Sequence, residues 1–287
     1  MELTPPQRRA RLGQELRRLR SLAGLSGDQL AARVGISQAK VSRIETNVTA
    51  RPAMDVIARW LDAVVATSED RERVMSLAEA VVTDISSWQA IHRGSLEDRQ
   101  RQLLELDELA SDIRHFQPFL VPGPFQTPEY AHAVIESARF SAGTDVDEAV
   151  AMRMKRGARL RDDRDGPQYH VVVTETAARW VPRGNSHLRR AQLEHLVLCA
   201  KAPRITLQVI LNDAPMEMSP MTGFVWVTYR DPSQAPVVRV ETPTVGLALG
   251  GSDDLATYGV VWDRMLRAAM SPEESVGWLT VIARNAS

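Results

Sequence analysis

Five side chains that lie close together in the sequence could contact the edges of DNA base pairs; they are Gln38, Ala39, Lys40, Ser42 and Arg43. A glutamine amide can bond adenine through two hydrogen bonds, and lysine or arginine can donate to O6 and N7 of guanine. An alanine methyl group can touch the methyl group of thymine, and serine can bond several bases. If one helix presented all five on one face, that face would have the chemistry to distinguish DNA sequences.

The surrounding stretch, residues 26–47, has the pattern of two short helices joined by a tight turn. Apolar residues recur at helical spacing on both sides of the turn and predict two helices packed against a third; they are Leu30, Val34, Ile36, Val41 and Ile44. Gly35 stands where a left-handed backbone conformation ends many helices. With Val41 and Ile44 facing the core, the five candidate residues would face outward. This is the pattern of a helix-turn-helix DNA-binding motif.

Both short helices begin at residues suited to cap them. Ser26 and Gln29 have the spacing of a capping box, and Ser37 can accept a backbone N–H at the start of the second helix. Asn47 stands where the second helix should end, and asparagine tolerates a left-handed conformation better than most residues. An ordinary helical hairpin is the alternative. The agreement between caps and buried positions favours the DNA-binding interpretation.

The charge of the chain is unevenly distributed. The net charge is −1, but residues 1–60 hold 11 Arg and Lys against 5 Asp and Glu, so the remainder carries −7. A basic head attracts phosphates, which supply much of the affinity of DNA-binding proteins. Leu12, Leu16 and Leu19 predict a helix in this head whose other face is rich in arginine. Glu45 could pair with one of these arginines and brace the second short helix from behind.

Residues 10–65 resemble the lambda-repressor-like, or XRE-family, helix-turn-helix domain. The resemblance rests on LGQELRRLR, on LSGDQLAARVGISQAKVSRIE and on the helix headed by Pro52. It implies double-stranded DNA as the partner and a phosphate contact for Gln29. The candidate DNA-binding residues are therefore Gln29, Ser37, Gln38, Ala39, Lys40, Ser42, Arg43 and Asn47. We expect a homodimer, because one reading helix makes too few base contacts and two half-sites about 34 Å apart double them.

A second resemblance covers most of the remaining chain. FLVPGPFQTPEY, residues 119–130, is similar to the VPGLLQTPEYA stretch of Streptomyces-type, antitoxin-like regulators, with Pro124 and Phe125 in place of two leucines. MRMKRGARL, VVVTETAARW, RAQLEHL and ITLQVI extend the similarity. This family joins an XRE head to a domain of unknown function. The resemblance also implies a small companion protein encoded nearby.

The pattern of elements predicts an α+β protein in which an all-α, lambda-repressor-like head precedes a larger mixed α/β domain. We expect a helix-turn-helix domain at 8–67, a connecting helix within 68–94 and a regulatory, dimerisation or partner-binding domain at 95–287. Strands are predicted near 168–176, 205–211, 223–229 and 236–242, and helices near 128–138, 146–160, 186–201, 253–269 and 272–283. A further helix is predicted from Ser95 to about Phe116, because Leu96, Leu103, Leu106, Ala110 and Ile113 follow a heptad-like spacing.

One group of residues in the larger domain could line a pocket. Glu175 follows an apolar strand, where its carboxylate could face a small-molecule or peptide site together with Phe125, Gln126 and Tyr130. The alternative is that the aromatic residues belong to the core. A single carboxylate without a partner acid or base does not indicate an enzyme.

Signs of a catalytic, metal or cofactor site are missing from the sequence. There is no phosphate loop, GxGxxG, HExxH or GxSxG motif, and none of the six histidines has a recognisable metal-ligand spacing. The single cysteine, Cys199, rules out an internal disulfide and lies in an apolar run typical of a buried residue. We therefore expect no cofactor, no metal and no catalytic residue. No apolar run could span a membrane, which favours a cytoplasmic protein.

The sequence as a whole predicts a sequence-specific, DNA-binding transcriptional regulator. Its C-terminal domain would dimerise and respond to a ligand or a small partner protein. An antitoxin-like protein that neutralises a companion protein is the alternative, and an enzyme with a DNA-targeting head is less favoured. Arginine outnumbers lysine by 32 to 3, a bias that suggests a bacterium with a GC-rich genome.

Overall fold

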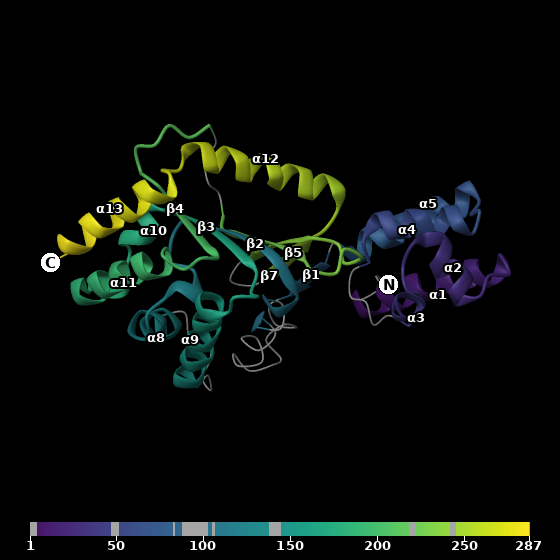
Figure 1. Cartoon of the computed structure of the whole chain (residues 1–287), viewed down its shortest axis with the longest axis horizontal. Helices are drawn as coiled ribbons and strands as arrows, with labels where there is room; N and C mark the ends of the chain where they lie inside the picture. The colour runs from purple at the N-terminus through teal and green to yellow at the C-terminus, as the bar shows by residue number, and fades with distance from the viewer. Residues whose placement is uncertain are drawn as a thin grey trace. The chain divides into compact units, whose positions relative to one another are not determined.

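The chain forms two compact units in a computed structural model that describes residues 5–46, 52–82, 84–87, 103–104, 107–137, 145–217, 222–241 and 245–286 (Figure 1). The first unit comprises Met1–Ile85, Tyr229–Val238 and Leu247–Leu255. The second unit comprises Ser86–Thr228, Arg239–Gly246 and Ala256–Ser287. Helices and a mixed sheet together make the chain an α+β protein, which confirms the predicted fold class.

In the N-terminal part of the first unit, the described residues form the helices α1 Pro5–Leu22, α2 Gly27–Val34, α3 Gln38–Glu45, α4 Met54–Ala63 and α5 Ser68–Val82. Every one of them contributes fully buried apolar residues to a common core, among them Leu16, Leu30, Val41, Trp60 and Val74. The connecting helix predicted within 68–94 is α5, which ends at Val82, and strand β1 occupies Asp84–Ser87. Because Val74, Ala78 and Val81 are buried in this core, α5 is part of the first unit rather than a free connector.

The caps and the turn between α2 and α3 agree with the sequence. Ser26 and Gln29 form a complete capping box, with Gln29 N–H donating to Ser26 Oγ at 3.1 Å and Ser26 N–H donating to Gln29 Oε1 at 2.9 Å. Gly35 ends α2 with φ +75°, ψ +39°, and its N–H donates to Ala31 O at 2.9 Å. Only glycine adopts this left-handed conformation at little cost, so it fixes the sharp change of direction into α3.

Over the described residues, seven strands form one sheet in the order β1-β7-β6-β5-β2-β3-β4. After β1, the strands are β2 Ala110–Gln117, β3 Gln168–Thr174, β4 Ile205–Ile210, β5 Phe224–Tyr229, β6 Val237–Glu241 and β7 Val245–Leu249. Strand β3 lies parallel to both β2 and β4, with Val171 opposite His115 on one side and Leu207 on the other.

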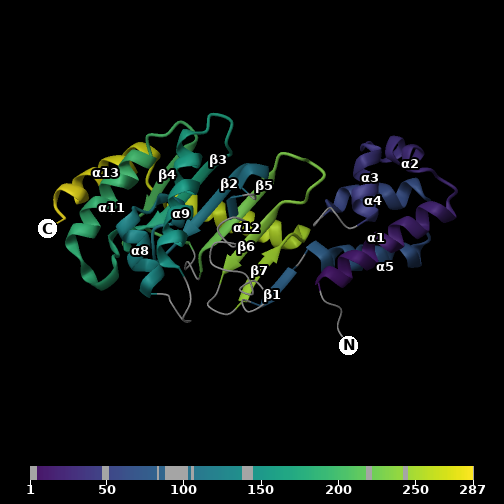
Figure 2. The ribbon, with the colours of Figure 1, turned by 90° about the horizontal axis from the view of Figure 1, so that it is seen from below.

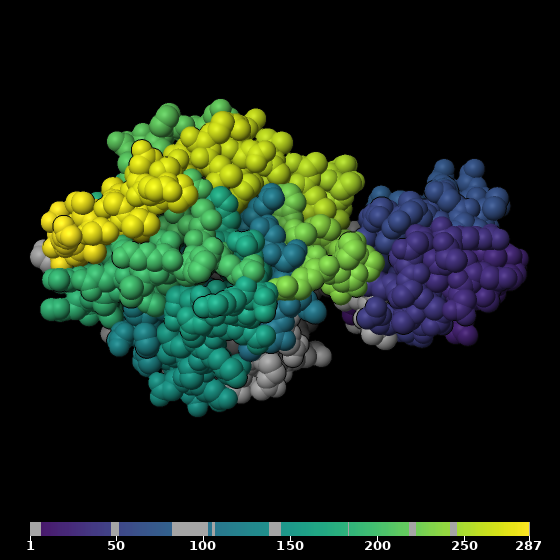
Figure 3. All heavy atoms as spheres, in the orientation of Figure 1, coloured from purple at the N-terminus to yellow at the C-terminus, as the bar shows by residue number. Residues whose placement is uncertain are grey.

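Helices cover the sheet on both faces. They are α8 Pro128–Ser137, α9 Val146–Asp162, α10 Glu175–Arg179, α11 Ser186–Cys199, α12 Ser252–Ala268 and α13 Pro272–Arg284, with short 3-10 turns at Gly123–Phe125 and Pro182–Gly184. Figures 1 and 2 show α8 and α9 on one face of the sheet and α12 on the other. Helix α13 packs against β4 and α11, and its outer side forms part of the surface shown in yellow in Figure 3. This arrangement buries the central strands from both sides.

The helix predicted from Ser95 to Phe116 is wrong at its C-terminal end, where residues 110–117 form β2. Strand β2 lies between β5 and β3 near the middle of the sheet. Ala110, Ile113, His115 and Phe116 are all buried, so side chains on both faces of the strand are covered. A strand covered on both faces loses the alternation of polar and apolar residues that would identify it in a sequence. Residues 88–102 lie outside the described part of the chain.

We predict that Gly13→Ala destabilises the protein, because α1 passes very close to the end of α3. A Cβ atom at Gly13 would lie 2.6 Å from Glu45 O and 3.0 Å from Ile44 O, and both are backbone atoms that cannot move independently of α3. We expect the free energy of unfolding to fall by about 1–3 kcal/mol, the usual cost of overpacking.

Gly277→Ala is the matched control, since Gly277 is also helical but a Cβ there would meet nothing within 4 Å. Denaturant unfolding followed by circular dichroism should show this variant unchanged or more stable by up to about 1 kcal/mol. Equal stability of the two variants would contradict the close approach of α1 to α3.

Candidate DNA-binding surface

Four of the five predicted base-contacting residues share one exposed face of α3. Successive helical residues are turned by about 100°, which places Gln38, Ala39, Ser42 and Arg43 on one side. All four are exposed, whereas Val41 and Ile44 on the opposite side are buried. We call these four residues the reading face. Together they offer an amide, a methyl group, a hydroxyl and a guanidinium, which suit the edges of bases in a major groove.

Lys40 is not part of this face, which corrects the prediction that it is exposed. Its position on the helix lies next to that of Ile44, and the residue is only 4% exposed. Its Nζ donates to Oδ2 of Asp231 at 2.7 Å. Asp231 lies in the connection between β5 and β6, within the part of the chain that belongs to the first unit.

The charge of Asp231 is firmly held. Partial burial raises the pKa of the carboxyl group, but hydrogen bonds from Lys40 and Ser233 outweigh this effect and lower the pKa to about 2. Ser233 donates its backbone N–H to Oδ1 at 2.9 Å, and its hydroxyl also donates to the same oxygen. The carboxylate is therefore ionised at neutral pH and fixed in position.

The serine and glutamine at the helix starts have structural roles. Ser37 caps α3, accepting the N–H of Lys40 at 3.2 Å through its Oγ. Gln29 uses its carbonyl oxygen in the capping box of α2. A Cβ at Gly27 would lie 3.4 Å from Nε2 of Gln38, so the first turns of α2 and α3 are adjacent. Two adjacent helix N-termini present partial positive charge, which suits phosphate oxygens.

The C-terminal end of α3 is anchored to α1, as the sequence suggested. Arg20 donates from Nε to Glu45 Oε1 at 2.6 Å and from Nη2 to Oε2 at 2.9 Å. Nη1 of the same guanidinium donates to the backbone oxygen of Leu25, in the loop before α2, at 2.8 Å. This bidentate ion pair fixes α3 relative to α1. Asn47, predicted to end α3, lies outside the described residues.

Three of the predicted pocket residues form a packed core rather than an open site. Phe125, Gln126 and Tyr130 are each no more than 1% exposed. Gln126 Nε2 donates to Val121 O at 2.6 Å, and its Oε1 accepts from Arg153 Nη1 at 2.7 Å. The Tyr130 hydroxyl donates to the backbone oxygen of Trp180 at 3.3 Å. Side chains that are enclosed and bonded in this way have no free surface for a ligand, which corrects the prediction.

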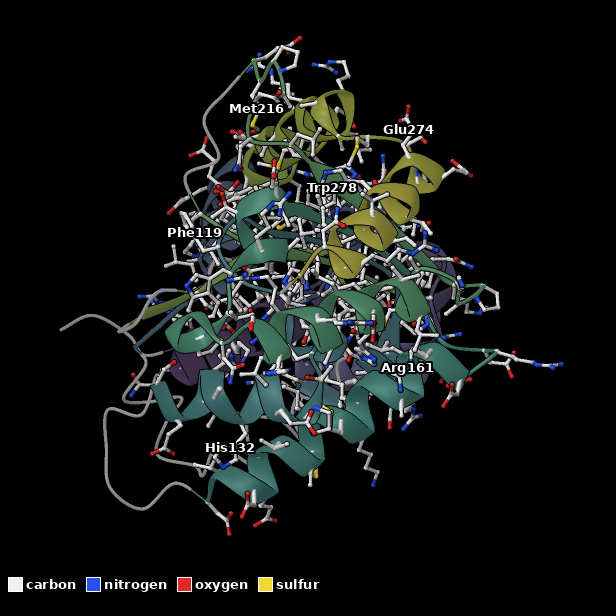
Figure 4. The ribbon with its side chains drawn as sticks, turned by 90° about the vertical axis from the view of Figure 1, so that its left-hand side faces the viewer. Phe119, His132, Arg161, Met216, Glu274 and Trp278 are labelled. Carbon is white, nitrogen blue, oxygen red and sulfur yellow. The ribbon has the colours of Figure 1, made fainter. Side chains whose placement is uncertain are left out.

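Glu175, the fourth predicted pocket residue, stands apart from that core at the start of α10. Its Oε1 accepts from Arg179 Nε at 2.7 Å, and its Oε2 accepts from the backbone N–H of Asn212 at 3.1 Å. Desolvation raises its pKa, but these two hydrogen bonds reverse the effect, and the net pKa is lowered. The same Arg179 places its guanidinium 5.2 Å from the ring centroid of Trp278, the α13 residue labelled in Figure 4. Glu175 therefore links α10 to its neighbours and remains ionised, which does not suit an acid catalyst.

Cys199 lies beside a histidine, but the pair does not suit a nucleophile. Its Sγ is 3.5 Å from Nε2 of His195, one turn earlier on α11. Burial raises the pKa of the thiol, against the opposing effect of Arg161, an α9 residue labelled in Figure 4. Burial also lowers the pKa of His195. Both groups are therefore neutral, whereas a nucleophilic cysteine requires a thiolate.

We predict that this thiol reacts with Ellman's reagent only after unfolding. Cys199 is completely buried, and a protonated thiol is a poor nucleophile. The same protein in denaturant is the control and should release one equivalent of chromophore, since the chain has one cysteine. Rapid labelling of the native protein would contradict both the burial and the raised pKa.

The structure contains a buried polar cluster around β2 and β3 that no sequence motif indicates. His115 Nδ1 lies 2.7 Å from the Tyr169 hydroxyl, while Arg156 forms a bidentate ion pair with Asp107. Burial and the nearby Arg156 lower the pKa of His115 to about 3. Burial also raises the pKa of Tyr169, so both side chains are neutral at pH 7. Among the described residues no group bonds His115 Nε2.

We predict that the protein loses stability below pH 6.5 partly because of His115. The unfolded histidine binds a proton near pH 6.5, whereas the folded one stays neutral until about pH 3. The contribution of neutral His115 to the free energy of unfolding is therefore at its maximum above pH 6.5, and it decreases as the pH falls toward 3. Between pH 7 and pH 4 it should contribute up to about 3 kcal/mol of that loss.

Thermal unfolding of wild type and His115→Gln across this range measures the effect. The variant should lose less stability than wild type as the pH falls, even if it is less stable at pH 7. His187→Gln, at an exposed position, is the control and should follow wild type. Parallel curves for wild type and His115→Gln would contradict the prediction.

Comparisons with known proteins identify two regions. Residues 11–74 match a family described as a helix-turn-helix domain, and residues 100–281 match a domain of unknown function, DUF5753. The two matches confirm the predicted pairing of a helix-turn-helix head with a C-terminal domain of unknown function. No curated protein matches the chain.

One solved structure shares low similarity with the chain. It is TrmBL2, an archaeal chromatin protein described as showing a novel mode of DNA binding. Identity is 10%, over 90% of this chain and 92% of that one, with a TM-score of 0.26.

Two further features are absent from the part of the chain that the structure describes. Within it, no helix is both long and apolar enough to cross a membrane. The same residues contain no group of three or more His, Cys, Asp or Glu side chains arranged to hold a metal ion.

Proposed function

We propose that this chain, which belongs to the DUF5753 family, is a sequence-specific DNA-binding transcriptional regulator. The observation that carries the proposal is the reading face of α3, held outward within a domain that matches the helix-turn-helix family at residues 11–74. A second helix of such a motif enters the major groove and contacts bases through its N-terminal residues. Gln38 and Ala39 are the first two residues of α3.

The side chains of the reading face define what they would recognise. In this proposal Arg43 donates to O6 and N7 of a guanine, Gln38 bonds an adenine, and the methyl group of Ala39 packs against a thymine. The adjacent N-termini of α2 and α3 bind phosphates and fix the register of the helix on the duplex. Arg43 is exposed on α3, so its guanidinium is accessible to a base.

The proposal includes two copies of the chain on one operator. A single four-residue reading face makes too few base contacts for a high specificity ratio, and two half-sites about 34 Å apart would double them. We further propose that the second unit supplies the dimer contact and the response to a ligand or small partner protein. No catalytic step is part of this proposal.

We predict that Gln38→Ala and Arg43→Ala each weaken operator binding by about 1–3 kcal/mol, roughly five- to 150-fold. Genome-wide footprinting with the intact protein would first supply the operator. Affinities for operator and scrambled duplexes would then be measured across a range of salt concentrations. Each variant should lose specificity at the base that its side chain contacts, because the lost hydrogen bonds are to that base.

Arg190→Ala is the matched control, since Arg190 is an exposed arginine of α11 in the second unit. Its operator affinity should equal that of wild type. Wild-type affinity in both reading-face variants would refute the assignment of α3 as the reading helix. A wild-type protein that binds no duplex specifically would refute the proposed function itself.

A further inference from the structure

The connection between β5 and β6 is a structural part of the first unit, although it lies far from the helices in sequence. The backbone oxygen of Ser233 accepts the N–H of Ala53 at 3.0 Å, just before α4. Gln234 forms an antiparallel bridge with Pro52. Ala235 is 3% exposed and belongs to the hydrophobic core of the helices. Residues 229–238 are thus attached by backbone hydrogen bonds and by apolar burial.

The same connection also holds the reading helix. Lys40 is the third residue of α3, and its ammonium group bonds Asp231 at 2.7 Å. The carboxylate cannot swing away freely, because the backbone and hydroxyl of Ser233 both donate to it. A buried ammonium group without this partner would be costly, so the pair constrains where the first turn of α3 can lie.

Two ion pairs therefore fix the two ends of α3. Lys40–Asp231 holds the N-terminal turn, and Glu45–Arg20 holds the C-terminal turn. Because α3 has only eight residues, the two ion pairs add to the burial of Val41 and Ile44 in resisting a tilt of the helix. A small tilt would displace Gln38, Ala39 and Arg43 from the base edges, since hydrogen bonds weaken steeply when distance and angle depart from their optimum.

We propose that Lys40 is a positioning residue for DNA recognition and that residues 229–238 are the support that orients the reading face. Lys40 acts through Asp231 and touches neither base nor phosphate. The inference rests on the proposed function, because it concerns how α3 is presented to DNA. Residues 229–238, which lie outside the helix-turn-helix domain, thus contribute to operator specificity.

Three variants with matched geometry test the proposal. Asp231→Asn keeps the shape of the side chain but removes its charge, Lys40→Met keeps most of the aliphatic stem, and the third variant combines both. Affinities for operator and scrambled duplexes are measured at several salt concentrations. Lys40→Arg is the conservative control, since its guanidinium can still pair with Asp231.

We expect each single variant to weaken operator binding by about tenfold, the order of one impaired base contact. The double variant should bind no more weakly than either single variant, because both remove the same interaction. Binding to scrambled duplex and the slope of log affinity against log salt should be unchanged, since no phosphate contact is lost. Lys40→Arg should retain operator affinity.

Three other results would overturn the proposal. Tighter binding by Asp231→Asn, with a steeper salt slope, would mean that Asp231 masks a DNA-contacting lysine. A shallower slope in Lys40→Met alone, by about one counterion, would mean that Lys40 contacts a phosphate. Unchanged operator affinity in all variants, with only a lower melting temperature, would mean that the pair is purely structural.

Misfolding and failure of the proposed function are both distinguishable from these results. Circular dichroism, together with wild-type affinity for scrambled duplex, shows that a variant is folded and competent. If both single variants unfold, Lys40→Arg and Asp231→Glu replace them. We expect Asp231→Glu to lose specificity, because its longer side chain displaces the ion pair. Failure of the proposed function would instead show as absent specific binding by wild type or wild-type affinity in Gln38→Ala and Arg43→Ala.

Discussion

The reading helix cannot be stable by itself. Isolated helices shorter than about 12–15 residues are marginal in water, and α3 has only eight. Its stability comes from the burial of Val41 and Ile44 against the other helices, from the Ser37 cap and from the two ion pairs at its ends. Because two neighbouring sides of the helix are used for these contacts, the remaining side is left to Gln38, Ala39, Ser42 and Arg43.

The parts of this arrangement that depend on neighbours in sequence could be predicted from the sequence. The capping box at Ser26, the left-handed Gly35 and the buried set on α2 and α3 are all local, and the structure confirms each of them. The bracing of Glu45 by an arginine of α1 was also foreseeable, because both lie in one small domain. Local propensity and helical periodicity were sufficient for these features.

The features that were missed depend on distant partners. Lys40 was expected to be exposed because a lysine on a short helix normally is, but its partner lies 191 residues away in a turn that reads only as a link between strands. Strand β2 was mistaken for a helix because it lies inside the sheet with side chains on both faces buried, so it lacks the alternation of polar and apolar residues. Gln126 and Tyr130 looked like pocket residues, whereas their polar atoms bond Val121, Arg153 and Trp180 inside the core. In each case the decisive contact is set by the tertiary fold.

The place of residues 229–238 in the first unit has a consequence for synthesis on the ribosome. The helices α1 to α5 leave the ribosome first, yet residues 229–238 of the same unit are made only after some 150 further residues. At about 5–20 residues per second, the nascent head waits roughly ten seconds or longer for Asp231 and Ala235. During that interval the ammonium group of Lys40 lacks the carboxylate of Asp231. A fragment that ends before residue 229 therefore corresponds to an unfinished translation product and not to the mature first unit.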